Sequence, residues 1–170
     1  MTTTITGATG VNQITDDAIT AAKLPAGSVL QVVQSNTILK SGTWTDNNNH
    51  LVCSVSITPK SPTSKMFITG QIVPQLYGNG NTVNMHWSLR IAKDSSNILE
   101  APSSHDNSVS GSNTRHKTPT HIISGINDSG NTNTRVYQIY LQKTEGSSNG
   151  RLQLHLTHGT TNIRVVEVEV

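Results

Sequence analysis

Seven histidines and one cysteine are the side chains of this sequence that could bind a transition metal. A zinc site usually takes three or four such ligands, with closely spaced pairs among them. No His-x3-His pair with a supporting carboxylate occurs, and Cys53 has no second cysteine to act with. His86 and His155 could meet if their strands paired, which leaves a metal on a trimer axis as the minor alternative. We therefore expect neither a metal nor another cofactor.

The carboxylates form no evident catalytic pair. Most of the acidic residues, Asp94 and Asp106 among them, lie in polar stretches that lack the apolar surroundings a general acid needs. The glycine-rich stretch 77–81 (YGNGN) has the composition of a turn. It does not stand between a strand and a helix, as a phosphate-binding loop does. The sequence therefore predicts a protein that is not an enzyme.

Two aromatic residues beside amide side chains suggest a different chemistry, the binding of a sugar. An aromatic ring can stack on the face of a sugar while neighbouring amides hydrogen-bond to its hydroxyl groups. Trp44 lies in the polar stretch TWTDNNNH, predicted to be a loop or a broken edge strand, and Tyr77 begins YGNGN, predicted to be a turn. Trp44, Asn48, Tyr77 and Asn79 are therefore the candidate glycan contacts. The alternative is that both rings close the ends of the folded domain.

The elements that must position these residues are β-strands with one buried face. Apolar residues occupy every second position in two runs, 51–57 and 66–72, which is the spacing of half-buried strands. In the first run the predicted buried residues are Leu51, Cys53, Val55 and Ile57. The stretch TPKSPTSK between the runs contains two prolines, so we expect a connection there.

The same alternation recurs along the rest of the chain. It predicts further strands over 28–34, 82–91, 120–126, 134–143, 151–157 and 163–170. About eight strands with regular turns favour an all-β fold, an antiparallel β-sandwich that is jelly-roll-like. In the last strand Val166, Val168 and Val170 oppose Glu167 and Glu169, which we expect to face water or a neighbouring subunit. The polar stretch 92–118 is expected to be mostly loop.

The first 27 residues are predicted to form an N-terminal arm ahead of a β-sandwich domain over 28–170. Thr15 is a good N-cap and Pro25 a stop, which predicts one short helix over 16–24. A helix of that length is marginal alone. Its apolar residues, Ile14, Ile19 and Leu24, must therefore dock on the β domain, on sister subunits or on another protein, and we expect them to anchor or trimerise the chain.

Composition excludes several classes of partner. The net charge is +2, without a cluster of basic residues and aromatics, so we expect no nucleic acid. No apolar run reaches the roughly 18–20 residues of a membrane helix, so we expect no membrane insertion. The start MTTTITGATG does not resemble a signal peptide. Hydrophobic residues make up 33% of the chain, a modest core that hints at burial shared between subunits.

Several stretches together resemble a β-sandwich domain found in structural proteins of tailed phages, especially those of cyanobacteria and marine bacteria. The likeness covers about 27–170 and includes AGSVLQVVQ, LVCSVSITPKSPTSKMFITGQI, WSLRI and the terminal VVEVEV. Its anchor residues are Gly27, Ser28, Leu30, Gln31, Ile57, Thr58, Pro59, Ser61, Ser64, Lys65, Leu89 and Arg90.

The resemblance implies a virion structural protein, assembled in the host cytoplasm and carried on the surface of the particle. It implies a homotrimer whose arm binds other virion proteins of the baseplate, tail or coat. The leading interpretation is a short tail fibre or adhesin that presents its β-sandwich to a host surface glycan. One alternative is a capsid decoration protein that stabilises the shell. Another is a stand-alone carbohydrate-binding module.

Overall fold

The computed structural model describes residues 23–36, 42–44, 47–83, 85–103, 109–117, 120–146, 150–154 and 161–170. Within these ranges the chain forms twelve β-strands. In chain order they are β1 Val29–Ser35, β2 Gly42–Trp44, β3 Asn49–Ile57, β4 Lys65–Ile72, β5 Pro74–Val83, β6 Met85–Lys93, β7 Ser96–Ser103, β8 Val109–Lys117, β9 His121–Asp128, β10 Arg135–Gly146, β11 Gly150–Leu154 and β12 Asn162–Val168.

The described strands form three antiparallel sheets of four strands each. The first sheet has the order β1-β12-β4-β9, the second β3-β10-β6-β7 and the third β2-β11-β5-β8. If the third sheet is set aside and the other eight strands are counted along the chain, the first two sheets read 1-8-3-6 and 2-7-4-5. This is the strand order of a jelly roll, so the predicted β-sandwich is confirmed.

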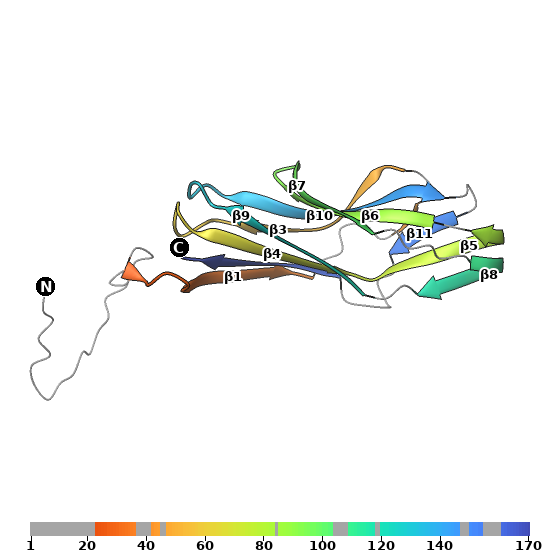
Figure 1. The fold of residues 1–170 in the computed structure, drawn as a ribbon, viewed down its shortest axis with the longest axis horizontal. Helices are drawn as coiled ribbons and strands as arrows, with labels where there is room; N and C mark the ends of the chain where they lie inside the picture. Colours follow the sequence, from red (N-terminus) through yellow and green to blue (C-terminus); the bar gives the residue numbers. More distant parts are fainter. Residues whose placement is uncertain are drawn as a thin grey trace, which may run out of the picture.

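The third sheet is built from the four connections that cross between the first two sheets at one end of the sandwich. β2 lies between β1 and β3, β5 between β4 and β6, β8 between β7 and β9, and β11 between β10 and β12. Figure 1 shows β5, β8 and β11 at the end of an elongated molecule opposite the C-terminus. We call these the third-sheet end and the arm end.

The core lies between the facing sides of the first two sheets. β4 and β12 contribute Met66, Ile68, Ile163 and Val165, while β10 contributes Tyr137, Ile139 and Leu141 from the opposite side, all fully or almost fully buried. Trp87 on β6 is 1% exposed, as its alternation with apolar residues predicts. The runs 66–72 and 134–143 are therefore strands whose apolar faces were identified correctly from their spacing.

The strand predicted over 51–57, which is β3 in the structure, contains a β-bulge that spacing alone does not reveal. β10 aligns Ile139 with Cys53 and Tyr140 with Leu51, so Val52 is left as the extra residue. A bulge shifts the alternation by one position. Consequently Val52 is fully buried and Leu51 only half buried. The prediction that Leu51 faces the core is wrong, whereas Cys53, Val55 and Ile57 are buried as expected.

Two stretches predicted as turn or loop are strands. Residues 77–81 (YGNGN) lie inside β5, because their backbone pairs with β8 and β11 in the third sheet. The stretch 92–118 contains β7 and β8, so the prediction of a mainly loop segment is wrong there. Asp94 and Ser95 form a two-residue turn between β6 and β7, with φ of 47° and 70°. Pairing to neighbouring strands thus overrides a turn-like composition.

Candidate functional site

A buried carboxylate holds the arm end of the sandwich together. Glu167 on β12 is 0% exposed. Its Oε1 accepts hydrogen bonds from the backbone N–H groups of Lys60 and Ser61, at 2.8 and 3.1 Å, and from the Ser64 hydroxyl at 2.6 Å. Its Oε2 accepts one from the Gln31 amide at 2.5 Å. The β3–β4 connection is therefore fastened to the last strand by one side chain.

The position of Glu167 and Glu169 corrects the sequence interpretation of the last strand. Both are buried, at 0% and 8% exposure, while Val170 is 59% exposed. The buried face of β12 contains Ile163 and Val165, which share their side of the strand with Glu167. Glu169 lies 3.4 Å from the hydroxyls of Ser61 and Thr63. The expectation that the two glutamates face water or another subunit is wrong.

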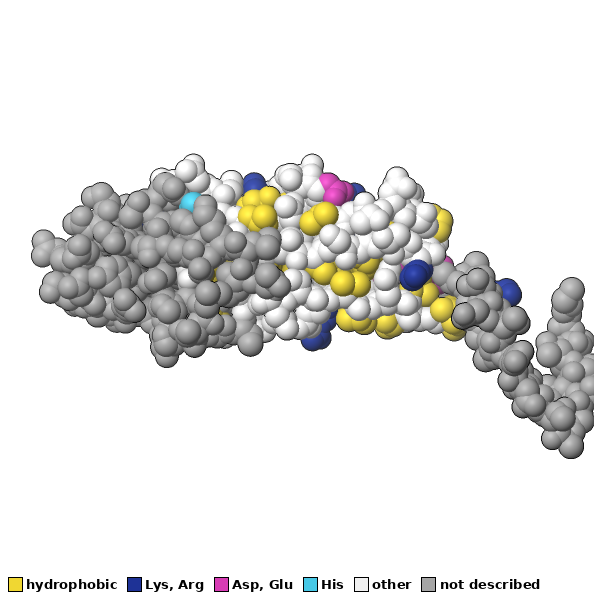
Figure 2. Space-filling view, turned by 180° about the vertical axis from the view of Figure 1, so that it is seen from behind, with side chains coloured by type: hydrophobic (Ala, Val, Ile, Leu, Met, Phe, Trp, Pro, Cys, Tyr) yellow, Lys and Arg dark blue, Asp and Glu magenta, His cyan; other side chains and the backbone are white. Residues whose placement is uncertain are grey.

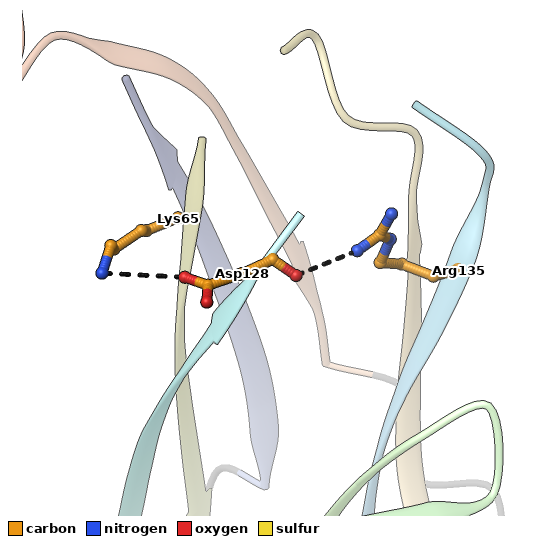
Figure 3. Close-up of polar contacts among 3 residues, drawn as sticks. All are labelled: Lys65, Asp128 and Arg135. Carbon is orange, nitrogen blue, oxygen red and sulfur yellow. Dashed lines mark hydrogen bonds and ion pairs between the residues drawn. The ribbon is translucent and has the colours of Figure 1, made fainter. Parts of the chain in front are cut away.

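A second polar contact ties the first sheet to the second at the same end. Figure 3 shows Asp128 at the end of β9 between Lys65 of β4 and Arg135 of β10. The Lys65 ammonium lies 3.6 Å from the Asp128 carboxylate, and Arg135 donates a 3.3 Å hydrogen bond to the Asp128 backbone carbonyl. Arg135 is 4% exposed. These contacts therefore join the two sheets at the arm end.

The outer face of the first sheet carries the most distinctive exposed feature of the described residues. Val32 on β1 aligns with Val166 on β12, Val166 with Phe67 on β4, and Phe67 with Ile126 on β9. We call these four residues the outer row. Val32, Phe67 and Ile126 are 56%, 40% and 60% exposed, and Val166 is half buried. An apolar row across four strands on an outward face is typical of a protein contact.

Of the two rows beside the outer row, one is half apolar and half charged and the other is polar. Toward the arm end, Val29 aligns with Val168, Val168 with Lys65 and Lys65 with Asp128. The residues of the polar row toward the third sheet are Gln34, Arg164, Thr69 and Ser124. Figure 2 shows hydrophobic side chains along the lower margin of the arm-side half, where β1 and β12 lie in Figure 1.

Three of the four candidate glycan contacts fall in the third sheet. Trp44 is the last residue of β2, an edge strand, while Tyr77 and Asn79 lie in β5. β11 separates the two strands and aligns Trp44 with Leu76, so the Trp44 and Tyr77 positions occupy neighbouring rows. Asn48 is exposed in the bend before β3. All four positions thus belong to the third-sheet end. Trp44 is in an edge strand, one of the two alternatives predicted for its stretch, whereas Tyr77 is in a strand and not in the predicted turn.

The predicted anchor residues lie at the other end. Ile14, Ile19 and most of the predicted helix 16–24 are outside the described residues. Leu24 is described and half buried. Pro25–Ser28 form a β-turn closed by a 3.1 Å hydrogen bond from the Ser28 N–H to the Pro25 carbonyl, with Gly27 at φ 88°. The Gly27 N–H also donates to the Glu169 carbonyl at 2.8 Å, which fixes where the arm joins the first sheet.

The described part of the chain contains neither a candidate transition-metal site nor a candidate membrane-spanning helix. No group of three histidine, cysteine, aspartate or glutamate side chains there is placed to hold a metal ion. His86 lies in β6, and His155 is outside the described residues. Within the same ranges, no helix is long and apolar enough to cross a membrane.

The outer row and the buried Glu167 were both missed from the sequence. Val32, Val166, Phe67 and Ile126 come from four separate strands, and only the strand order places them side by side. A signal for the second feature was present, since Ser61 and Ser64 lie in a short loop that offers several donors. A glutamate on a strand with apolar neighbours can be buried where such donors converge.

No family model and no curated protein matches this sequence. Among solved structures, the chain is similar to a protein in the crystal structure of the T13 IBDV viral particle, with a TM-score of 0.34 and 11% identity. It is also similar to one in the structure of the infectious bursal disease virus Gx strain, with a TM-score of 0.32 and 12% identity. Each alignment covers 82% of this chain but only 35% or 36% of the other, so the chain spans about a third of their length.

Proposed function

We propose that this chain is a structural protein of a virus particle, a trimeric fibre or adhesin-type protein. In this proposal residues 1–27 attach it to other virion proteins, and the third sheet projects toward the host. The observation that carries the proposal is the separation of two ends. The arm joins the first sheet beside Glu169, whereas all four strands of the third sheet lie at the opposite end.

The arm end suits attachment because hydrogen bonds hold two of its connections in place. The connection 58–64 is fastened to Glu167, and the connection 129–134 is fastened by Arg135, whose guanidinium donates to the Asn131 carbonyl at 2.8 Å and to the Asp128 carbonyl at 3.3 Å. A force applied at the arm would therefore be transmitted directly into both sheets. The resemblance to tailed-phage surface domains, carried in part by the same stretch 57–65, supports the assignment to a virion.

The third-sheet end suits recognition. Trp44, Asn48, Tyr77 and Asn79 all lie at this end although they come from distant parts of the sequence, and a host surface glycan is the ligand that aromatic and amide residues would bind. Jelly rolls occur in viral capsid proteins and in lectins, so the fold itself permits both roles and decides neither.

Electron microscopy of the virus particle with the chain labelled by an antibody fragment is the direct test. We expect density on the tail or at a vertex fibre, with the third sheet distal and with loss of the density when residues 1–27 are deleted. Location flat on the capsid face would instead establish a decoration protein. Absence from particles, together with glycan binding by the isolated chain, would establish a carbohydrate-binding module and overturn the virion assignment.

A further inference from the structure

We propose that the arm end carries a calcium-binding site, formed by the Glu169 carboxylate and the hydroxyls of Ser61 and Thr63. This goes beyond the proposed function, which needs no metal. The evidence begins with Glu169, whose side chain is 8% exposed. Its Oε2 is buried and has no hydrogen-bond partner among the described residues. A buried carboxylate oxygen without a partner is costly, and a bound cation compensates it directly.

The other oxygen of Glu169 has contacts that are too long for ordinary hydrogen bonds. Its Oε1 lies 3.4 Å from the hydroxyl oxygens of both Ser61 and Thr63. A hydroxyl that donates to a carboxylate normally approaches to about 2.5–2.7 Å. The Ser64 hydroxyl does so in the same loop, at 2.6 Å from Glu167. The distances around Glu169 therefore need another explanation.

The same distances match those between neighbouring ligands of a calcium ion. Calcium binds oxygen at about 2.4 Å, often in a pentagonal bipyramid, so neighbouring ligands lie about 2.8 Å apart within the pentagon and about 3.4 Å from an apex. The Ser61 and Thr63 oxygens are 2.9 Å apart, and each is 3.4 Å from Oε1 of Glu169. Magnesium prefers an octahedron with neighbouring ligands about 2.9 Å apart. The two longer separations therefore favour calcium.

The charges around the site also favour a cation. Glu167 is fully buried and contacts the same residue as Glu169, because the Ser61 N–H donates to it at 3.1 Å. Two buried carboxylates so close together repel each other. Among the described residues, no basic side chain forms an ion pair with either glutamate, and Lys65 pairs with Asp128 instead. A calcium ion would offset this buried negative charge.

Solvent can reach the site from one side, because Thr63 is exposed. Calcium takes six to eight oxygen ligands, so water would complete its shell there. Glu167 is not a ligand, since its Oε1 already accepts three hydrogen bonds and its Oε2 accepts another. With a single carboxylate ligand, we expect a Kd of about 10⁻⁴–10⁻³ M, as in weak calcium modules. The spacing of histidines and cysteines does not reveal such a site, because calcium takes oxygen ligands.

The site is coupled to the arm through the backbone of Glu169. The Glu169 N–H donates to the Ser28 carbonyl at 2.9 Å, and the Glu169 carbonyl accepts from the Gly27 N–H at 2.8 Å. An ion bound to the Glu169 side chain would therefore also steady the junction of arm and sheet. Calcium would then control how firmly the arm is seated for attachment. That consequence rests on the proposed function, whereas the site itself does not.

Calorimetric titration of the purified full chain with calcium chloride tests the site. We expect one ion to bind per chain, and calcium to raise the thermal midpoint more than an equal concentration of magnesium. Glu169→Gln removes the charge but keeps the size of the side chain, and it should weaken binding by about tenfold or more. Thr63→Val removes a ligand hydroxyl from an exposed residue and should also weaken binding. Asp128→Asn is the matched control, because it removes an 80% exposed carboxylate, and it should bind calcium like the unmodified chain.

Several results would overturn the site. One is no binding at about 10 mM calcium, well above the expected Kd. Others are binding that Glu169→Gln and Thr63→Val leave unchanged, or equal midpoint shifts with calcium and magnesium, which would show an effect of ionic strength alone.

Hydrogen exchange of the Gly27 and Glu169 amides measures the coupling to the arm. Exchange should be slower in calcium than in EDTA, and Glu169→Gln should remove the difference. Equal exchange in both solutions would overturn the coupling. None of these measurements uses virus particles, so their failure would leave the microscopy test of attachment to be decided separately.

Discussion

The Ser64 hydroxyl donates a 2.6 Å hydrogen bond to the Glu167 carboxylate, and both residues are 0% exposed. A bond of this length between a hydroxyl and a carboxylate is of the strong, charge-assisted kind. It joins the β3–β4 connection to the final strand, across 103 positions of sequence. The arm end therefore depends on a contact between two stretches that the sequence keeps far apart.

Glu167→Gln should destabilise the fold. Both carboxylate oxygens of Glu167 accept hydrogen bonds. In the glutamine variant an NH2 group replaces one of these oxygens, so at least one donor loses its acceptor. A buried donor left without an acceptor costs about 1–3 kcal/mol of unfolding free energy. Urea denaturation followed by circular dichroism measures the loss.

Asp128→Asn is the matched control for that experiment. Its carboxylate also has a partner, Lys65 at 3.6 Å, but its side chain is 80% exposed. Exposed ion pairs contribute only about 0–1 kcal/mol. Equal losses from the two variants would contradict the view that Glu167 is the fastening point of the arm end.

The same contact explains part of the sequence resemblance. The ITPKSPTSK stretch and the terminal VVEVEV are far apart in the sequence, and both belong to that resemblance. In the fold they meet, because Ser61 and Ser64 of the first hydrogen-bond to Glu167 of the second. These residues of the resemblance therefore have a structural role, and they carry less weight as evidence of a particular binding activity.

Period-two spacing predicted which residues share a face but not always which face is buried. In β12 the spacing correctly separates Val166 and Val168 from Glu167, yet the glutamate side faces the core. The choice depends on Ile163 and Val165, on the same side, and on donors supplied by a distant loop. Spacing within one strand contains none of that information.

Sequence spacing also failed to predict how the residues of the candidate site are arranged. Trp44 and Tyr77 were identified from local composition, but their positions in one sheet follow from the pairing of β2 and β5 with β11. The outer row likewise depends on the order β1-β12-β4-β9. Non-local pairing sets both arrangements, and spacing along the chain does not reveal it before the fold is known.

Gly70→Ala should be costly because a side chain there would enter the core. A Cβ at Gly70 would lie 2.0 Å from Cδ1 of Ile139 and 3.2 Å from Cγ2 of Ile123. Ile139 is fully buried, so the overlap forces repacking, and we expect a loss of about 1–3 kcal/mol in unfolding free energy. Thermal denaturation of Gly70→Ala and of Gly70→Ala/Ile139→Val should show partial recovery in the double variant.

Gly125→Ala is the corresponding control on the neighbouring strand. There the nearest atom to an added Cβ is Cδ2 of Leu99 at 3.4 Å, an ordinary contact. We expect unchanged or slightly raised stability, because alanine restricts the unfolded chain more than glycine does. If Gly125→Ala were as damaging as Gly70→Ala, loss of backbone freedom rather than core overlap would be the cause.

Ser95→Gly should stabilise the β6–β7 hairpin. Asp94 and Ser95 both have positive φ, 47° and 70°, which only glycine adopts without cost. Asp-Gly is the preferred sequence for such a two-residue turn. We expect a gain of about 0.5–1 kcal/mol, measured as a higher urea midpoint.

Asp94→Ala tests the other half of the same turn. The Asp94 carboxylate accepts a 2.8 Å hydrogen bond from the Val136 N–H and so connects the turn to β10. Its loss should lower the unfolding free energy by about 1 kcal/mol, which is measured as a lower urea midpoint. An unchanged Asp94→Ala would mean that this hydrogen bond contributes nothing, because alanine keeps the Cβ and so relieves none of the strain at positive φ.

Cys53 should make the fold less stable in alkaline solution. Burial raises its pKa from 9.0 to about 12. Below pH 9 the thiol is protonated in both folded and unfolded chains, so its contribution to stability is fully present there. Between pH 9 and about 12 the unfolded chain releases the proton while the folded chain keeps it, so unfolding becomes progressively more favourable.

The comparison with Cys53→Ala separates this effect from other groups that titrate in the same range. Burial also raises the pKa of Tyr137, which adds a loss of its own above pH 10 in both proteins. The alanine variant loses the thiol-dependent part only, so its unfolding free energy should fall less steeply between pH 9 and 12. If the unfolding free energies of the two proteins changed with pH in parallel, Cys53 would ionise as readily in the folded chain as in the unfolded one. That would contradict its complete burial in the core.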